Sequence, residues 1–386
     1  MHHNISTLSP IYGKLRVSKA NVDRHSAGRT RGITGLVYSS VRTITQGVGF
    51  AINFALTQLD AQFASTSVKS PRNEKLDAIK SVINGVIGDR LAASGNTLAI
   101  QAHLRASGEH PSTLPKIIGT ASNAVVATAA KVRWIVMVHG LCMNDWQWTR
   151  DGHNHGEQLA QLMNAQVYYF VYNSGESITK NGEALARSLQ NLLIEYPALK
   201  PEITLICHSM GGLVSRRACQ FAEQFSMPWF TCIKAIVFLG TPHQGALLER
   251  AGQWVDRALG FSPYSAPFAR LSKVRSVGIN DLCNGIPNSP VDALPSRIAC
   301  YAVAASKEKC PSPGVATPLK RAPARVIARL HGDGLVTVPS ALGDHKQLSK
   351  SLAIAPANRL VCYETDHFDL LSSQLVFKQL EKWLVP

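Results

Sequence analysis

Residues 203–212, ITLICHSMGG, place an apolar run, a sharp turn and the start of a helix within ten consecutive positions. The apolar run predicts a buried strand, and the spacing of apolar residues after Gly212 predicts a helix to about residue 225. A strand that passes directly into a helix needs a tight turn, and small residues there let the two elements approach. Gly211 and Gly212 meet this need, whereas Cys207 is larger than the glycine that usually stands two positions before such a turn.

From residue 131 onward, short apolar runs alternate with amphipathic segments. Strands are predicted at residues 134–138, 165–172, 203–207, 233–239, 298–304 and 359–363. Helices are predicted at residues 155–164, 180–196, 210–225 and 373–384. This alternation predicts an α/β fold in which helices cover both faces of a mostly parallel sheet, with active residues at the carboxyl ends of the strands.

Residues 1–130 differ from the rest and are predicted to form a basic, mostly helical N-terminal extension. Apolar residues at three- and four-residue spacing predict helices at 35–63 and 74–93. Such an amphipathic pair packs on the main domain, or it associates with a membrane or forms a hydrophobic lid. Residues 1–131 hold 15 Lys and Arg against 6 Asp and Glu, so they carry +9 of the net charge of +15. That excess suits an anionic membrane surface as partner or simply a soluble basic protein, and no nucleic-acid-binding motif accompanies it.

The sequence predicts a cytoplasmic protein, with peripheral association with a membrane as the alternative. The N-terminus lacks a charged region followed by a long apolar stretch, so no secretory signal is expected. No window approaches about 18 uncharged apolar residues, the length that a membrane-spanning helix needs. The eight cysteines form no CxxC pair, and several, such as Cys207 and Cys362, lie in apolar runs typical of buried free thiols.

Three residues in the order serine, acid, histidine predict nucleophilic catalysis. Ser209 lies at the turn between strand and helix, where a nucleophile projects above the sheet. A serine hydroxyl becomes nucleophilic when a base takes its proton, and a third group must orient that base. Asp333 lies 124 residues after Ser209 in a glycine-flanked turn, and His367 lies 34 residues after Asp333, following the last predicted strand. Taken singly, Asp333 could only form a turn and His367 could only cap a helix, but their order favours a Ser209–Asp333–His367 triad.

Other acids and histidines are competitors for these roles. Asp366 adjoins His367, so its side chain is expected to point elsewhere, and His208 is expected to diverge from its neighbour Ser209. The remaining competitors are Asp281, Asp292, Asp344, Asp369, His139, His243 and His331.

Two backbone N–H groups are predicted to form an oxyanion hole for a tetrahedral intermediate. One belongs to Met210, directly after the nucleophile, and the other to Leu141 in the loop VHGLC after an early strand. The alternative is that His139 and Gly140 only end a strand.

Five ordered segments, VHGLCMNDWQW, CHSMGG, FLGTPHQGA, GDGLVTVPSALG and DHFDLL, resemble lipase-like members of the α/β-hydrolase superfamily. The resemblance is to bacterial lipases and the related glycan-anchor-deacylase-like esterases, and it covers residues 131–386. It implies an α/β-hydrolase catalytic domain over these residues and a structural role for His243. A cap insertion at about residues 247–325 is expected to shield the acyl site from water, although a plain surface excursion fits nearly as well.

These features predict a serine carboxylic-ester hydrolase, a lipase or esterase that works through an acyl-enzyme and needs no metal or organic cofactor. The substrate would be an ester or a lipid. An acyltransferase using the same triad is the first alternative, and a membrane-associated interaction protein on a hydrolase scaffold is the second. The polar segment DGHNHG holds Asp151, His153 and His155, but its spacing matches no zinc pattern and favours a loop that opens a helix.

Overall fold

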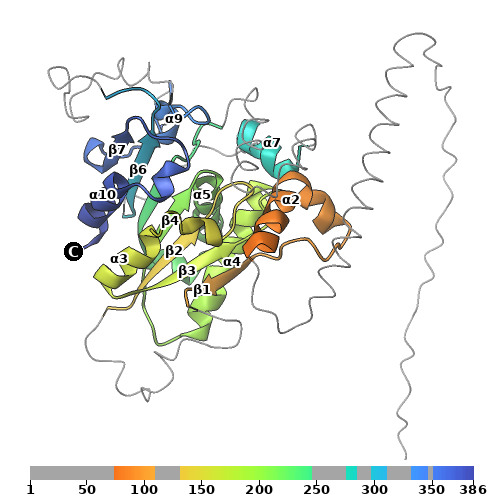
Figure 1. The fold of residues 1–386 in the computed structure, drawn as a ribbon. Coiled ribbons are helices and arrows are strands. Elements are labelled where there is room, and N and C mark those ends of the chain that lie inside the picture. Colours follow the sequence, from red (N-terminus) through yellow and green to blue (C-terminus); the bar gives the residue numbers. More distant parts are fainter. Residues whose placement is uncertain (1–73, 109–130, 246–274, 285–296, 311–331, 347–350) are drawn as a thin grey trace, which may run out of the picture. The chain divides into compact units, whose positions relative to one another are not determined.

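A computed structural model describes residues 74–108, 131–245, 275–284, 297–310, 332–346 and 351–386, drawn in colour in Figure 1. The helix predicted at 35–63 and the rest of residues 1–73 lie outside these ranges, as does much of the predicted cap at 247–325. Among the described residues, no helix combines the length and the apolar character that crossing a bilayer requires.

The centre of the structure is a seven-stranded sheet with the order β1-β3-β2-β4-β5-β6-β7. β1 runs antiparallel to β3, and every other neighbouring pair is parallel. The strands are β1 (His103–Ala106), β2 (Arg133–Val138), β3 (Ala165–Val171), β4 (Glu202–His208), β5 (Ile233–Leu239), β6 (Ala299–Ala305) and β7 (Arg359–Cys362). Apolar side chains fill both faces of the central strands, since Ile135, Val136 and Met137 of β2 are all fully buried. This burial is what makes near-continuous apolar runs the sequence pattern of parallel strands.

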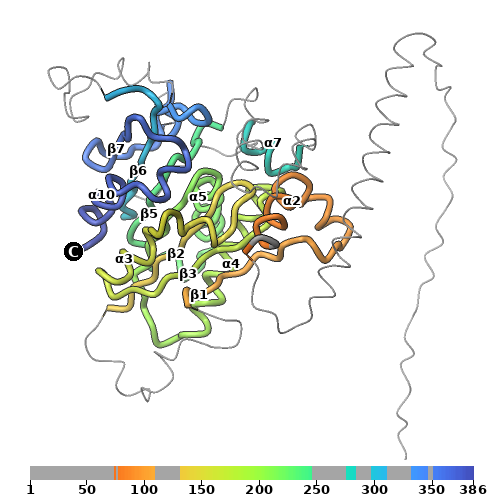
Figure 2. Tube along the Cα trace, viewed as in Figure 1, coloured from red at the N-terminus to blue at the C-terminus, as the bar shows by residue number. Residues whose placement is uncertain are grey.

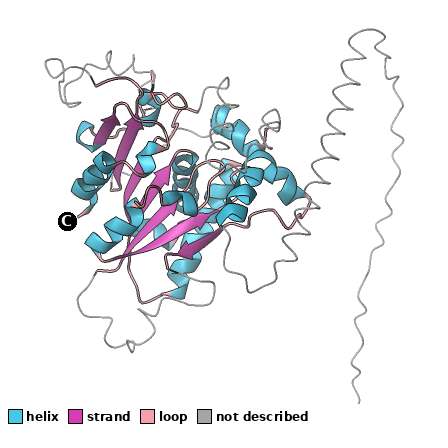
Figure 3. Ribbon diagram, in the orientation of Figure 1, coloured by secondary structure: helices cyan, strands magenta, loops and turns pink. Residues whose placement is uncertain are grey.

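Helices cover both faces of the sheet (Figures 1 and 3). On one face α4 and α5 pack together, and Gly182 of α4 lies directly against Ala218 of α5. On the other face α3 and α10 meet, with the rings of His155 and Phe377 stacked at 6.1 Å between centroids. The helices are α2 (Glu74–Ala93), α3 (His155–Met163), α4 (Ile178–Glu195), α5 (Met210–Gln224), α7 (Val277–Asn284), α9 (Val338–Ala341) and α10 (Gln374–Leu384). The prediction of a mostly parallel sheet with helices on both faces is confirmed.

Two elements lie within ranges that the sequence assigned to other parts of the chain. β1, in the range 1–130 assigned to the N-terminal extension, pairs with β3 and forms one edge of the sheet. β6, predicted as a strand at 298–304, pairs with β5 and β7 in the central sheet, so the expected range of the cap, 247–325, includes a strand of that sheet. A strand as short as β1 carries little apolar periodicity.

Segments far apart in the sequence lie side by side at one end of the sheet. Figure 2 shows α2 beside α7, and the hydroxyl of Ser276, just before α7, donates to the carbonyl of Gly85 at 2.7 Å. α2 is interrupted at Ile87, whose φ of −134° and ψ of 17° are not helical. The predicted helix at 74–93 is thus present as α2, and it packs on the domain that carries the sheet.

Candidate active site

Ser209 lies at the junction of β4 and α5 in a strained backbone conformation. Its φ of 55° and ψ of −123° fall in a region that residues with a Cβ rarely adopt. The N–H of Ser209 donates to the carbonyl of Leu239 at 2.9 Å, which ties the turn to the end of β5. The side chain is 1% exposed, and its hydroxyl has no hydrogen-bond partner among the described residues. A buried hydroxyl held this way has the geometry of a nucleophile elbow.

Gly211 explains why the turn needs a glycine two positions after Ser209. A Cβ added there would lie 2.2 Å from the carbonyl oxygen of Val138 and 2.5 Å from that of His139. Both contacts are with backbone atoms, so neither can be relieved by rotating a side chain. The start of α5 can therefore approach the end of β2 only because this residue has no side chain.

Cys207 occupies the position before the turn where glycine is usual. Its sulfur lies 3.0 Å from the hydroxyl of Ser215, one turn into α5. Burial raises the pKa of the Cys207 thiol to about 12, so the thiol is protonated at neutral pH. A buried, protonated thiol is a poor nucleophile, which leaves Ser209 as the candidate at this turn.

Asp333 and His367 form a buried pair at the carboxyl end of the sheet. Nδ1 of His367 donates to Oδ2 of Asp333 at 2.7 Å, and the two side chains are 0% and 1% exposed. The other carboxylate oxygen of Asp333 accepts the backbone N–H groups of Leu335 and Val336, each at 2.8 Å. These bonds fix the carboxylate, and the carboxylate fixes the imidazole with its Nε2 as the nitrogen that is left to act as a base.

The pKa of Asp333 is below its usual value despite burial. Burial alone would raise the pKa of this carboxyl, but the neighbouring His367, the hydrogen bond from its ring and the two backbone N–H groups together lower it. Asp333 is therefore ionised at neutral pH, which is the state that an orienting carboxylate needs.

The ring of His367 lies beside the elbow. A Cβ added to Gly240 would be 2.9 Å from Cε1 of His367, and Gly240 directly follows Leu239, the acceptor of the Ser209 N–H. On the other side, Nε2 of His208 donates to the carbonyl of His367 at 3.2 Å. The structure thus places the Asp333–His367 pair next to the turn that carries Ser209.

The competing residues have other contacts. The carboxylate of Asp366 accepts the backbone N–H of His367, and that of Asp281 accepts the backbone N–H of Ile178. Asp369 forms an ion pair with Arg150. Asp344 makes two hydrogen bonds with Arg359. Burial lowers the pKa values of His139, His208 and His243, so these rings are neutral at pH 7 and none of them contacts Asp333 in the described hydrogen bonds. Asp292 and His331 lie outside the described residues.

The predicted oxyanion loop lies against Ser209. A Cβ added to Gly140 would be 3.1 Å from Cβ of Ser209, so the loop passes the nucleophile at close range. Met210 is the first residue of α5, where a backbone N–H has no acceptor within its own helix. The N–H groups of Leu141 and Met210 donate in no hydrogen bond within the described part of the chain. Both N–H groups are therefore without an acceptor among the described residues.

Several residues that the sequence did not single out hold this loop in place. The hydroxyl of Ser174 accepts the N–H of Cys142 at 2.9 Å, and the ring of Tyr172 stacks on that of His139 at 4.2 Å. Ser174 follows the end of β3, so its position at the carboxyl edge of the sheet was the available clue.

α2 supports the same loop from a part of the chain far from the elbow. Nε1 of Trp146 donates to Asp77 at 3.1 Å, and the side-chain amide of Asn144 donates to the hydroxyl of Ser81 at 3.0 Å. A Cβ added to Gly85 would lie 2.2 Å from the sulfur of Cys142. α2 and the oxyanion loop are in close contact, and nothing in the sequence pattern of 74–93 indicated this.

A cavity of about 250 Å³ lies between the segment after the oxyanion loop and the segment after His367. Its apolar lining comes from Cys142, Met143, Trp146, Phe368 and Leu371, and its polar lining from Glu74, Gln147, Thr149 and Arg150. A second cavity of about 580 Å³ includes Glu202 and Lys234, near the amino ends of β4 and β5. Of these two cavities, the first lies at the carboxyl ends of the strands, where Ser209 is found.

The DGHNHG segment opens α3, as predicted. Asn154 caps the helix, its side-chain oxygen accepting the N–H of Glu157 at 3.2 Å. Within the described ranges, no three His, Cys, Asp or Glu side chains are grouped as metal ligands.

The sheet order, the elbow between β4 and α5 and the loop carrying His367 have the arrangement of the α/β-hydrolase fold. More narrowly, residues 130–284 match the family of the PGAP1-like alpha/beta domain. No curated protein sequence matches the chain.

Solved structures of hydrolases resemble the chain at low sequence identity. The mature lipase BlEst2 of Bacillus licheniformis has a TM-score of 0.46 and 20% identity, covering 74% of this chain and 98% of that one. The type II thioesterase YbtT of a yersiniabactin biosynthetic pathway has a TM-score of 0.39 and 16% identity, covering 66% and 94%. The metagenomic carboxyl esterase MGS0156 has a TM-score of 0.36 and 17% identity, covering 80% and 87%.

Proposed function

We propose that the protein is a serine hydrolase of carboxylic esters with Ser209 as nucleophile, His367 as general base and Asp333 as the orienting acid. The observation that carries the proposal is the buried 2.7 Å hydrogen bond between Asp333 and His367, beside a serine in a strained turn. A structural ion pair would have no need for that neighbouring serine. Strain and perturbed titration found at one place favour a functional site.

The reaction follows from the geometry. Nε2 of His367 takes the proton of Ser209 as the hydroxyl oxygen attacks the ester carbonyl, and the negative oxygen that forms accepts the N–H groups of Leu141 and Met210. The imidazolium returns its proton to the leaving alcohol, and an acyl-enzyme remains. Water then repeats the sequence on the acyl-enzyme, which releases the acid and restores the serine. Each step moves only protons and acyl groups, so the chemistry calls for no metal or organic cofactor.

We also propose that the acyl part of the ester occupies the cavity of about 250 Å³. Its apolar wall includes Met143, two residues after Leu141, and Phe368, the residue after His367. The volume corresponds to about eight water molecules at ~30 Å³ each. That space suits a short to medium acyl chain, so activity on p-nitrophenyl esters is expected to rise with acyl length and then fall.

The experiment compares purified protein with a Ser209→Ala variant on these esters, with fluorophosphonate labelling alongside. Removing the nucleophile is expected to lower kcat/KM by at least about 10³-fold and to abolish labelling, because a triad acts as a unit. Equal activity in the two proteins, or labelling that persists in the variant, would remove Ser209 from the mechanism. A wild-type protein that is neither active nor labelled would favour an interaction protein on a hydrolase scaffold.

Transfer of the acyl group to an alcohol or a thiol is the alternative for the same triad. It differs only in the group that attacks the acyl-enzyme. Adding a series of alcohols to the assay and measuring the new ester against the free acid separates the two reactions.

For the N-terminal part of the chain, we propose an anionic membrane surface as the partner that brings the enzyme to lipid esters. Support comes from the net charge of +9 in residues 1–131, most of which lie outside the described ranges. Binding to vesicles containing anionic lipid is expected to weaken as salt is raised, because the attraction is screened. Binding that is absent or independent of salt would contradict it. A cytoplasmic location likewise stays a prediction.

A further inference from the structure

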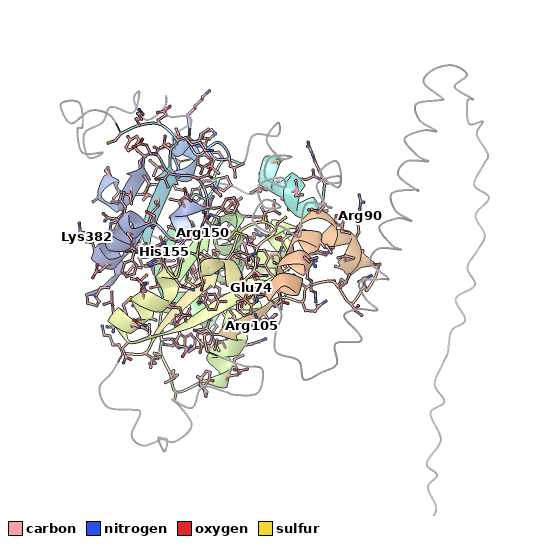
Figure 4. All side chains as sticks on the ribbon, viewed as in Figure 1. Glu74, Arg90, Arg105, Arg150, His155 and Lys382 are labelled. Atoms are coloured by element: carbon pink, nitrogen blue, oxygen red, sulfur yellow. The ribbon has the colours of Figure 1, made fainter. Side chains whose placement is uncertain are left out.

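The segment from Arg150 to His155 has no part in the proposed reaction, yet it contacts the chain that follows His367 at several points. Figure 4 labels Arg150 and His155 at its two ends. Nη2 of Arg150 lies 3.3 Å from a carboxylate oxygen of Asp369. The hydroxyl of Ser372 donates to a carboxylate oxygen of Asp151 at 3.4 Å. These contacts indicate that the segment, besides opening α3, holds the residues that follow His367 in place.

Two buried histidines in this segment form a hydrogen-bonded chain with a fixed direction. Nε2 of His155 lies 2.9 Å from the carbonyl oxygen of Leu370, and a carbonyl can only accept, so this nitrogen carries the proton. Nδ1 of His155 then accepts from Nε2 of His153 at 2.7 Å. Nδ1 of His153 in turn accepts from the amide of Gln374 at 3.2 Å. Every link is satisfied only when both rings are neutral.

Leu370, the last acceptor in this row of hydrogen bonds, lies near the proposed base His367. Leu370 lies in the short helix Asp369–Leu371, which begins two residues after His367 and in which the N–H of Leu371 donates to the carbonyl of Phe368 at 3.1 Å. A Cβ added to Gly240 would lie 3.1 Å from Cδ1 of Leu370 and 2.9 Å from Cε1 of His367. Both side chains therefore rest on the same glycine, and a movement of Leu370 would move the imidazole.

We propose that His153 and His155 are positioning residues that hold the turn of His367 against the elbow through the carbonyl of Leu370. The inference rests on the proposed function, since it assumes that His367 is the base. Protonating His155 would set two N–H groups against each other across the 2.7 Å contact with His153, and protonating His153 would do the same across the 3.2 Å contact with the amide of Gln374. Acid is thus expected to loosen the base before the fold is lost.

The surroundings of the two rings oppose protonation in part. Burial lowers the pKa of His155 to about 4 and also lowers the pKa of His153. The charged groups nearby are Arg150 and Asp151 on the same segment and Asp369 on the facing turn. α10 presents uncharged groups, the amide of Gln374 and the ring of Phe377.

A pair of variants separates the hydrogen bonds from the packing. His155→Phe keeps a ring that can stack on Phe377 but removes both hydrogen bonds, whereas Phe377→Leu removes the stacking and leaves the hydrogen bonds. His155→Gln is the conservative variant, because its amide can again donate to the carbonyl of Leu370. Each folded protein is compared by the rate of Ser209 labelling with a fluorophosphonate and by Tm.

If the two histidines position the base, Ser209 labelling of His155→Phe should be at least about tenfold slower than that of the wild type. The labelling rate of Phe377→Leu should stay within twofold of wild type at a similar Tm. The labelling rate of His155→Gln should largely return to that of the wild type. Should His155→Phe fail to fold, His153→Phe removes the hydrogen bonds to His155 and Gln374 but leaves the one between His155 and Leu370, and slowing of threefold or more is expected. Wild-type rates in the folded His155→Phe or His153→Phe proteins would overturn the positioning role, whereas an unlabelled wild type would overturn the proposed function itself.

Discussion

Replacing Asp333 by Asn tests the assignment of the acid with the smallest change in shape. The carboxylate uses Oδ1 for two backbone N–H groups and Oδ2 for Nδ1 of His367. An amide can keep its oxygen toward the two N–H groups, which places its NH₂ group against the ring. Nδ1 must then accept, so the proton of the neutral imidazole moves to Nε2, the nitrogen that should take the proton of Ser209.

The size of the effect follows from this change of tautomer. The same substitution of the orienting aspartate in a serine protease lowers kcat by about 10⁴-fold while the geometry is kept. That factor corresponds to about 5.5 kcal/mol of lost transition-state stabilisation. Stability should change much less, by about 1 to 2 kcal/mol, because a charge-assisted hydrogen bond becomes a neutral one and no buried group loses its partner.

The assay is kcat/KM on a p-nitrophenyl ester at pH 7 to 8, with Tm measured on the same samples. Asp366→Asn is the matched control, since Asp366 adjoins His367 but accepts its backbone N–H rather than its ring proton. That variant is expected to stay within about tenfold of wild type. If Asp333→Asn retained activity within tenfold, or if Asp366→Asn were the more damaged protein, Asp333 would not be the orienting acid.

Three further predictions follow from close contacts and from buried histidines. Gly211→Ala is expected to lower stability by about 1–3 kcal/mol and to reduce activity, because the new Cβ would meet two backbone carbonyls, and urea unfolding measures the loss. Gly85→Ala should slow Ser209 labelling by pressing on Cys142, and Cys142→Ala in the same protein should restore the rate; no rescue would show that α2 does not act through this contact. Burial lowers the pKa values of His139 and His155 to about 4, so between about pH 6.5 and 4 the unfolded chain binds more protons than the folded one. Stability should therefore fall with acid in this window, by up to about 1.4 kcal/mol per pH unit for each histidine, and a urea midpoint unchanged between pH 7 and 5 would argue against buried neutral rings.

The strands and helices of the sheet from residue 131 onward could be predicted because burial on two faces leaves a clear mark in a sequence. The runs at 134–138, 203–207 and 233–239 each fall within a strand of the structure, and the ends of the predicted helices agree within about two residues. The order serine, acid, histidine likewise pointed to residues at one edge of the sheet, where Asp333 and His367 form a hydrogen bond, because the fold brings the ends of parallel strands together there.

The parts that support the site from a distance leave no comparable sign in the sequence. β1 has only four residues and a mostly polar pattern, so its place at the edge of the sheet depends on pairing with β3. The contacts of α2 with the oxyanion loop depend on Gly85 and on the polar residues Asp77 and Ser81, none of which stands in an apolar pattern. Periodicity reports burial against water, and it does not report which polar partner a side chain will find.

Cys207 illustrates the same limit at the centre of the site. Judged within the turn alone, a cysteine two positions before Ser209 is a departure from glycine that should crowd the elbow. In the folded chain its sulfur is directed at Ser215, which is small, and the tight backbone contact at Gly211 is between α5 and the end of β2. The space that glycine would leave at one position is therefore supplied by a small residue on the facing helix. A glycine two positions before the nucleophile makes room for the residue that faces it on the helix. A larger residue at that position therefore argues against an elbow only where the facing helix residue is also large.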